Sequence, residues 1–330
     1  MNRDKISYSL QKLLGHYNFI KLLAFVKYEL NFRHFYVGGD KLRKGIKGKT
    51  LIYMADGRTP HGGFSDRLRG IFSLYEFCMK EGIDFKVHFT NPFELKTFLV
   101  PNEYDWSIKD TEISYNKKET EFRFVNSYSS MTEEFYGKYL HTNKNNVQIH
   151  AYSNFTSHEE KFHEYFNELF KFSPMLDDKL NAYLKDIGTD YISVSFRLIS
   201  LLGDFKDSAF AHELPDENEK NVYIERCKSF IERLHTEYPQ YPKILVTSDS
   251  GILLKHIENI PYVYIIKGEV IHMDYVDKHI EGHLKTMIDY FLISKAQKVF
   301  CYSYGKMYKA TRFAKTAALI GGKDFEMVSE

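Results

Sequence analysis

The sequence has few of the features that mark several large protein classes. Of its 330 residues only three are cysteine, and Cys78, Cys227 and Cys301 are widely spaced, with no Cys-x-x-Cys pair. An odd, scattered set of cysteines predicts neither a structural disulfide nor a zinc site, and it favours a reducing compartment. The formal net charge is only +1, so the bulk electrostatics indicate neither nucleic acid nor an acidic partner.

Long apolar runs are also missing. No stretch of about 18 uncharged apolar residues occurs, so we expect no transmembrane helix. Residues 18–32 are rich in apolar side chains but are interrupted by Lys21, Lys27 and Glu29. We therefore expect no secretion signal and a cytoplasmic location. A docking helix accounts best for this stretch; because basic residues follow it, the alternative is a peripheral contact of residues 18–49 with the inner membrane face.

Common catalytic and nucleotide-binding motifs are absent. The chain has no Gly-x-Gly-x-x-Gly fingerprint, no P-loop lysine and no Gly-x-Ser-x-Gly nucleophile elbow. It also has no Asp-x-Asp pair, which many sugar-nucleotide enzymes use to hold a metal ion. His279 and His283 are four residues apart, but Glu281 is the third residue of that segment and not the second, as a zincin requires. We expect no metal site and no cofactor.

What is present indicates a globular protein with two domains. Hydrophobic residues make up 43% of the chain and charged residues 27%, which is a core-forming composition. A length of 330 residues suits two domains of ordinary size. We expect them to comprise residues 1–160 and 161–330.

The first half begins with a strand, a glycine-rich turn and a helix. We expect strands at 50–54, 87–89, 122–125 and 147–150. The turn contains Gly62 and Gly63, and helical spacing of apolar residues starts after it, with Ser65 or Asp66 as the N-cap. A helix N-terminus behind such a turn can face an anion.

The second half alternates strands and helices, which predicts an α/β fold with a doubly wound parallel sheet. We expect helices at 159–172, 177–184, 221–237, 252–257, 284–296 and 306–319. We expect strands at 191–197, 243–248, 262–266 and 298–302.

The strand at 191–197 is the centre of this pattern. Ile192, Val194 and Phe196 form its apolar face, and Arg197 stands where the strand should end. Ligands bind at the carboxyl ends of strands in open α/β sheets, and a guanidinium there can hold a phosphate with two parallel hydrogen bonds. The simpler alternative is a surface arginine at a strand end.

Four segments, in this order, resemble the GDP-fucose-dependent fucosyltransferase superfamily, whose members have the two-domain GT-B fold. Residues 62–71 are similar to its Gly-Gly-x-x-x-Arg-x-x-x-Ile loop, and residues 194–197 to its His-x-Arg segment. Residues 245–250 resemble its strand that ends in threonine and aspartate. Residues 288–296 resemble its Asp-x-x-x-Leu-Ser-x-Ala block and run into a serine turn at 301–305.

The resemblance implies two Rossmann-like domains facing a central cleft, with the acceptor on the side of residues 1–160 and the nucleotide sugar on that of 161–330. It implies that Arg197 holds the diphosphate and that Asp289 pairs with the guanine edge. Further donor contacts are implied for Gly62, Gly63, Arg67, Asp249, Ser250, His283, Ser303 and Tyr304. The sequence departs from the family pattern at Ser195, where histidine is usual, and at Leu198, where several members have a second arginine.

The function implied is an inverting, metal-independent glycosyltransferase that moves fucose from GDP-fucose to a glycan acceptor in surface polysaccharide assembly. Arginine can neutralise the leaving diphosphate in place of a metal ion. The general base stays open among Asp56, His61, Asp66 and Asp204, of which Asp66 and Asp204 are our leading candidates. One alternative is a transferase that uses another nucleotide sugar. The other is a non-catalytic protein that binds a glycan or nucleotide, which Ser195 would favour.

Overall fold

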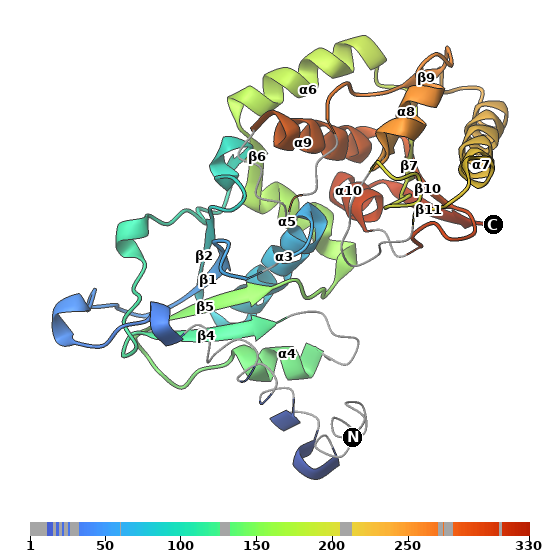
Figure 1. Cartoon of the computed structure of the whole chain (residues 1–330). Helices are drawn as coiled ribbons and strands as arrows, with labels where there is room; N and C mark the ends of the chain where they lie inside the picture. The colour runs from blue at the N-terminus through green and yellow to red at the C-terminus, as the bar shows by residue number, and fades with distance from the viewer. Residues whose placement is uncertain are drawn as a thin grey trace. The chain divides into compact units, whose positions relative to one another are not determined.

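The computed structural model describes residues 12–15, 18–19, 22, 26, 33–59, 61–125, 133–204, 213–269, 273, 280–309 and 312–330. The helix expected at 18–32 therefore lies almost wholly outside the described residues. The chain divides into two compact units, each with its own parallel sheet (Figure 1). The first unit contains the described residues up to His61 with Arg67–Phe89 and Asp105–Ser157, and the second contains Gly62–Asp66, Thr90–Tyr104 and His158–Glu330.

The first unit is built on a four-stranded parallel sheet in the order β2-β1-β5-β4. Its strands are β1 (Lys49–Ala55), β2 (Asp84–Phe89), β4 (Thr120–Val125) and β5 (Val147–Ser153), and its helices are α4 (Glu133–Leu140) and most of α3 (Phe64–Glu81). The four strands expected in the first half are confirmed. Helix α3 begins at Phe64, so Ser65 and Asp66 lie in its first turn and do not cap it.

Both faces of this sheet are buried. Ile52 and Met54 of β1 face a cluster that includes Tyr36 and Tyr152. On the other face α3 comes very close to the sheet at Gly70, where an added Cβ would lie 2.0 Å from the carbonyl oxygen of Ser153. Glycine at this position is what allows the helix to pack directly on β5.

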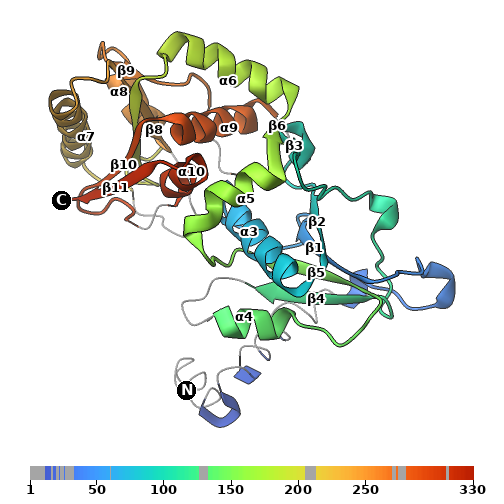
Figure 2. The ribbon, with the colours of Figure 1, turned by 180° about the vertical axis from the view of Figure 1, so that it is seen from behind.

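The second unit has a five-stranded parallel sheet in the order β11-β10-β7-β8-β9. The strands are β7 (Tyr191–Phe196), β8 (Lys243–Ser248), β9 (Val263–Tyr264), β10 (Lys298–Ser303) and β11 (Asp324–Ser329). The helices are α5 (Phe162–Leu169), α6 (Pro174–Ile187), α7 (Glu217–Glu237), α8 (Gly251–Ile257), α9 (Ile280–Lys295) and α10 (Phe313–Gly321). Figures 1 and 2 show α7 on one side of this sheet and α9 and α10 on the other, so the predicted doubly wound α/β class is confirmed.

The alternation in β7 explains these layers. Ile192, Val194 and Phe196 share one apolar core with α7. Tyr191 points to the opposite face, where its hydroxyl donates to the carbonyl of Leu292 in α9 at 2.7 Å. The strand is therefore buried on both sides, as central parallel strands are.

Two expectations about the second half are wrong in part, and one strand was not expected. The helix expected at 159–172 stops at Leu169, and β6 (Phe170–Phe172) pairs antiparallel with β3 (Leu99–Pro101). The helix expected from residue 306 starts at Phe313, because the preceding segment folds into a turn in which the amide of Tyr308 bonds the carbonyl of Arg197 at 3.1 Å. Strand β11 was not expected.

Five short 3-10 helices complete the described elements: η2 (Arg33–Phe35), η3 (Asp40–Leu42), η4 (Leu95–Thr97), η5 (Asp110–Glu112) and η6 (Glu159–Lys161). None of the helices formed by the described residues is both long enough and apolar enough to span a bilayer.

Two buried histidines in the first unit link its stability to pH. His150 of β5 lies 2.7 Å from the hydroxyl of Tyr36, and His61 is buried beside the ring of Tyr152. Burial, reinforced by nearby positive charge, lowers the pKa of each imidazole to about 3. Because the unfolded chain takes up these protons near pH 6.5, stability should fall as the pH drops from about 6.5 towards 3.

We predict that His150→Gln weakens this pH dependence, since it removes one group whose folded-state pKa is depressed. Its melting temperature should fall less than that of the wild type between pH 7.5 and pH 5, as measured by thermal unfolding. His141→Asn, at an exposed histidine of the same unit, is the matched control and should melt like the wild type at both pH values. An unchanged pH dependence in His150→Gln would contradict the account.

Candidate functional site

The carboxyl edge of the second sheet gathers several of the residues that the sequence singled out. Strands β7, β8 and β10 are adjacent and parallel, and Phe196 is in register with both Ser248 and Tyr302. The residues that follow these strands, Arg197, Asp249 and Tyr304, therefore emerge at one edge. This is the edge at which open α/β sheets bind ligands.

Asp249 holds the turn that follows β7. Its carboxylate is buried and accepts from the amide of Leu198 at 2.8 Å and from that of Ile199 at 2.9 Å. Ile199 has a φ of 55°, a left-handed conformation that is rare for a β-branched residue. Strained backbone of this kind persists only where its surroundings hold it, and the carboxylate of Asp249 does so here.

The same carboxylate orients Arg197. Nε of Arg197 lies 3.5 Å from Oδ2 of Asp249, while 30% of the arginine side chain is exposed. Burial raises the pKa of Asp249, and Arg197 together with the two amide groups opposes that rise. The arginine is thus fixed on its Nε side at the sheet edge, in a geometry that suits an incoming anion.

Ser195 occupies the position at which the family pattern has histidine. Its hydroxyl lies 2.6 Å from that of Thr247, its register partner on β8, and the side chain is buried. The two hydroxyls satisfy each other across the sheet. Thr247 was absent from our candidate residues, although it stands in a segment that carried the resemblance.

Ser250 and Asp204 act together at the start of α8. Oδ2 of Asp204 accepts from the hydroxyl of Ser250 at 2.9 Å and from the amide of Ile252 at 2.8 Å. The oxygen of Ser250 in turn accepts from the amide of Leu253 at 3.2 Å, as an N-cap does. Both side chains are therefore engaged in holding the helix that follows β8.

The turn after β10 holds the last residues of this edge. The hydroxyl of Ser303 lies 3.0 Å from that of Ser329 on β11. The ring of Tyr304 packs against Tyr223 and beneath the guanidinium of Arg226, which is 4.9 Å from the ring centre. Ser303 is buried, whereas Tyr304 is partly exposed.

Helix α9 carries a second cluster. Asp289 and Lys285 form a buried ion pair one turn apart, and Oδ1 of Asp289 has no hydrogen-bond partner within the described parts of the chain. Burial raises the pKa of Asp289, and Lys285 opposes that rise. His283 is buried against the ring of Phe93 at 5.0 Å. The i, i+4 spacing of Lys285 and Asp289 in the sequence is the signal that could have indicated this pair.

The residue that follows the glycine-rich turn, Phe64, packs against α9. The ring of Phe64 lies 5.1 Å from that of Tyr290, next to Asp289 in the chain. Gly62 has a φ of 78°, and an added Cβ there would come within 2.6 Å of Oδ2 of Asp66, so only glycine fits. Gly63 is partly exposed beside it.

The remaining candidates lie in the first unit. Arg67 is buried with its guanidinium 5.0 Å from the ring centre of Phe89. Asp56 is ion-paired with Arg58 at 2.8 Å and accepts from the hydroxyl of Tyr152 at 3.1 Å. His61 is buried, and its low pKa keeps it neutral at pH 7.

The structure thus brings five predicted residues into one connected region at the sheet edge: Ser195, Arg197, Asp204, Asp249 and Ser250. Asp289 and His283 belong instead to α9, and none of the contacts described for the chain links them directly to Arg197. Across the described ranges, no three His, Cys, Asp or Glu side chains are grouped as a metal site would require.

Comparison with known proteins places this geometry in context. No protein-family model and no curated protein sequence matches the chain. The α-1,6-fucosyltransferase NodZ, from crystals soaked with GDP-fucose, matches with a TM-score of 0.54 and 14% identity over 83% of this chain and 92% of that chain. The fucosyltransferase NodZ from Bradyrhizobium matches with a TM-score of 0.55 and 14% identity over 83% and 93%.

A variant of FUT1 from Arabidopsis thaliana, in complex with GDP, matches with a TM-score of 0.53 and 10% identity over 88% of this chain and 71% of that chain. These similarities show that the chain has the fold of these proteins. The GT-B-like α/β class with parallel sheets that the sequence resemblance implied is therefore confirmed.

We predict that Asp249→Asn destabilises the second unit, because an amide cannot accept from both backbone N–H groups and no longer pairs with Arg197. The expected cost is about 1–3 kcal/mol, seen as a melting temperature lower by several degrees. Asp190→Asn makes the same change at an exposed acid just before β7 and should leave the melting temperature unchanged. Equal stability of the two variants would show that the carboxylate does not hold the turn.

Proposed function

We propose that this protein is an inverting, metal-independent glycosyltransferase that transfers fucose from GDP-fucose to a glycan acceptor. The observation that carries the proposal is Arg197, which stands at the carboxyl end of β7 and is oriented there by the buried Asp249. It is supported by the fold, which the chain shares with a fucosyltransferase from crystals soaked with GDP-fucose.

The proposed chemistry needs positive charge where the leaving group develops negative charge. When the bond between fucose and the diphosphate breaks, the phosphate oxygens gain charge, and a preorganised cation stabilises them. Arg197 supplies that cation in our proposal, and Gly63, Ser303 and Tyr304 contribute contacts to the donor. No step in this scheme requires a metal ion.

The acceptor hydroxyl needs a general base, and the contacts of the candidates differ. Asp204 is occupied in capping α8, and Asp56 is held by Arg58 and Tyr152. Asp66 lies in the first turn of α3 and is partly exposed. We therefore assign the base to Asp66 and give Asp204 a positioning role at the turn after β8.

We propose that Asp289 on α9 binds the guanine base of the donor. A carboxylate can accept from both the N1–H and the exocyclic amine of guanine, and adenine does not offer this pair of donors. Oδ1 of Asp289 lacks a hydrogen-bond partner within the described residues, and Lys285 already holds Oδ2. Binding of guanine by Asp289 would require this ion pair to rearrange, and we propose that His283, on the same helix, contributes a further contact to the nucleotide.

The two halves of the chain receive complementary roles in this proposal, with residues 1–160 on the acceptor side and residues 161–330 on the nucleotide-sugar side. We propose a glycan of surface polysaccharide assembly as the acceptor and the cytoplasm as the place of reaction. The three cysteines, all buried and unpaired, are consistent with a reducing compartment.

We predict that Arg197→Ala lowers transfer from GDP-fucose by about 100- to 1,000-fold, the usual effect of removing one preorganised donor. Release of GDP is measured in the presence of EDTA, where the wild type should keep its full activity. Arg197→Lys should stay well below the wild type, since a point charge does not replace the planar guanidinium. Near-normal turnover by a folded Arg197→Ala protein would falsify the assignment.

A second variant, Asp66→Asn, tests the general base independently of the diphosphate site. Asp66→Asn should abolish transfer to the acceptor while GDP binds with unchanged affinity in calorimetry. If this variant transfers fucose at the wild-type rate, the base lies elsewhere.

For the guanine assignment we predict that Asp289→Asn weakens GDP binding by about tenfold or more, because a charged acceptor is lost from a buried contact. ADP binding, weak in both proteins, should not change. Since Lys285 is left with a neutral partner, thermal unfolding must first show that the variant is folded at the temperature of the titration. Equal GDP affinities in calorimetry would remove guanine recognition from Asp289.

A further inference from the structure

A basic surface lies at the amino edge of the first sheet, the edge opposite the turn that directly follows β1. Strands β1, β4 and β5 are parallel and start in register, with Lys49 opposite Val147 and Thr120 opposite Gln148. The segments that precede them, 38–48, 116–119 and 141–146, therefore meet at the amino edge of the sheet. The bond from the amide of Gly48 to the side chain of Asn146, at 2.9 Å, joins two of them directly.

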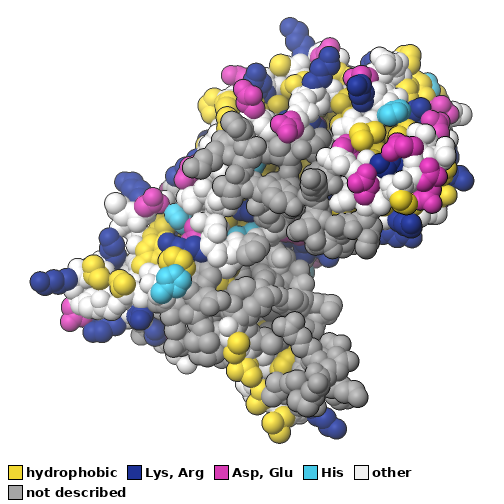
Figure 3. All heavy atoms as spheres, viewed as in Figure 1, with side chains coloured by type: hydrophobic (Ala, Val, Ile, Leu, Met, Phe, Trp, Pro, Cys, Tyr) yellow, Lys and Arg dark blue, Asp and Glu magenta, His cyan; other side chains and the backbone are white. Residues whose placement is uncertain are grey.

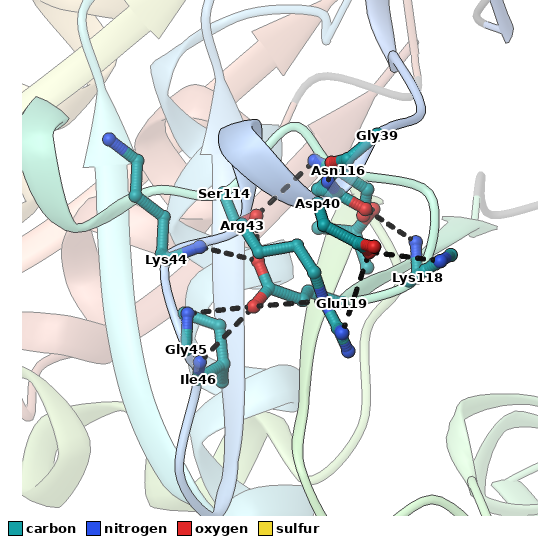
Figure 4. Close-up of polar contacts among 11 residues, drawn as sticks. Gly39, Asp40, Arg43, Lys44, Gly45, Ile46, Ser114, Asn116, Lys118 and Glu119 are labelled. Carbon is teal, nitrogen blue, oxygen red and sulfur yellow. Dashed lines mark hydrogen bonds and ion pairs between the residues drawn. The ribbon is translucent and has the colours of Figure 1, made fainter.

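The carboxylate of Glu119 fixes this edge from inside. It accepts from the amides of Lys44 at 2.8 Å and Gly45 at 2.7 Å, and from the hydroxyl of Ser114 at 2.7 Å (Figure 4). Burial alone would raise the pKa of Glu119, but these hydrogen bonds bring it below its usual value. Glu119 thus stays ionised; its charge is directed mainly at the backbone of the loop, and Nε of Arg43 also lies 3.9 Å from Oε1.

Seven exposed cations surround this fixed loop, and we call them the basic edge: Lys41, Arg43, Lys44, Lys47, Lys117, Lys118 and Lys144. Three of these cations are ion-paired. The carboxylate of Asp40 lies 3.0 Å from Nζ of Lys118 and 3.8 Å from the guanidinium of Arg43, and that of Glu121 lies 3.0 Å from Nζ of Lys144. No ion pair involving the other four is found within the described part of the chain. Figure 4 shows the side chain of Lys44 extending away from Glu119.

A recess of about 540 Å³ opens among these cations. It is lined by Arg43, Lys44, Gly45, Ile46, Lys118, Glu119 and Asn146. The carboxylate of Glu119 is already engaged by the amides of Lys44 and Gly45 and by Ser114, and the three cations of the lining suit a phosphate group at its mouth.

Apolar side chains are exposed beside the same cations. Leu42 is 53% exposed and Val37 46%. Figure 3 shows lysine and arginine side chains gathered with hydrophobic ones at the end of this unit that lies at the left of the view. A soluble polyanion would satisfy the charges alone, whereas a bilayer with anionic head groups accommodates both kinds of side chain.

We propose that the basic edge, with Val37 and Leu42, docks the protein on an anionic phospholipid bilayer. When the amino edge of the first sheet contacts the lipid, the turn after β1 lies at the opposite edge of the same sheet and faces away from the lipid. Of the membrane contact considered for residues 18–49, the proposal keeps the described residues from 33 onward and adds Lys117, Lys118 and Lys144. It does not depend on the proposed transferase activity.

Co-sedimentation of the full chain with vesicles tests this proposal. The protein should bind vesicles that contain phosphatidylglycerol and remain in the supernatant with phosphatidylcholine alone. Reversing three charges in Lys44→Glu/Lys47→Glu/Lys117→Glu should lower the partition coefficient by at least about tenfold. The matched control, Lys179→Glu/Lys185→Glu/Lys255→Glu, reverses three exposed charges in the second unit and should bind like the wild type.

Two further measurements distinguish binding to a lipid bilayer from binding to soluble anions. Leu42→Ser should weaken vesicle binding even in high salt, where the charge term is screened. Equal loss in the basic-edge and control variants, or binding to soluble polyphosphate without binding to anionic vesicles, would overturn the proposal. Melting temperatures of both triple variants should match the wild type, so that lost binding is not a folding defect.

Discussion

The proposed active site depends on one buried carboxylate. Asp249 accepts from the backbone of Leu198 and Ile199 and pairs with Arg197, so a single side chain fixes both the turn and the arginine. The left-handed φ of Ile199 is a local cost that this contact offsets. Because β7 and β8 are parallel neighbours, the two segments that Asp249 joins emerge side by side. The geometry that Arg197 needs therefore follows from the sheet, and the carboxylate completes it.

In the first unit a buried carboxylate likewise fixes a loop, but at the amino edge of the sheet. Glu119 is buried and accepts from the consecutive amides of residues 44–46, and Lys41, Lys44, Lys47 and Lys117 around this loop are exposed. In both units a parallel sheet brings loops from distant parts of the chain to one edge, and an internal anion then sets their shape. At the carboxyl edge of the second sheet the result is an oriented arginine; at the amino edge of the first sheet it is a fixed basic surface.

The strands of the fold could be predicted where apolar residues run together, as in β1, β8 and β10, or alternate with serine, as in β7. Strand β11 was missed because acidic residues such as Asp324 and Glu326 are rare in strands, and its pairing with β10 outweighs this preference. The end of α5 was missed because strand pairing of Phe170–Phe172 with Leu99–Pro101 outweighs helical periodicity. At the site, sequence order indicated Arg197, Asp249 and Ser250. The capping role of Asp204 depends on tertiary contacts that no local pattern contains. The Lys285–Asp289 pair is local, because residues four apart on a helix lie on the same face, and its spacing could have indicated it.

The central claim is that the second unit binds a guanosine diphosphate sugar, and its most direct test is a thermal-shift comparison of GDP, UDP, ADP and CMP on the wild-type protein. A ligand at about 100 times its dissociation constant adds about 2.7 kcal/mol of stability, which is a shift of several degrees. The account predicts that GDP raises the melting temperature well above the other three nucleotides. A larger shift with UDP or ADP, or no shift with any of them, would contradict it.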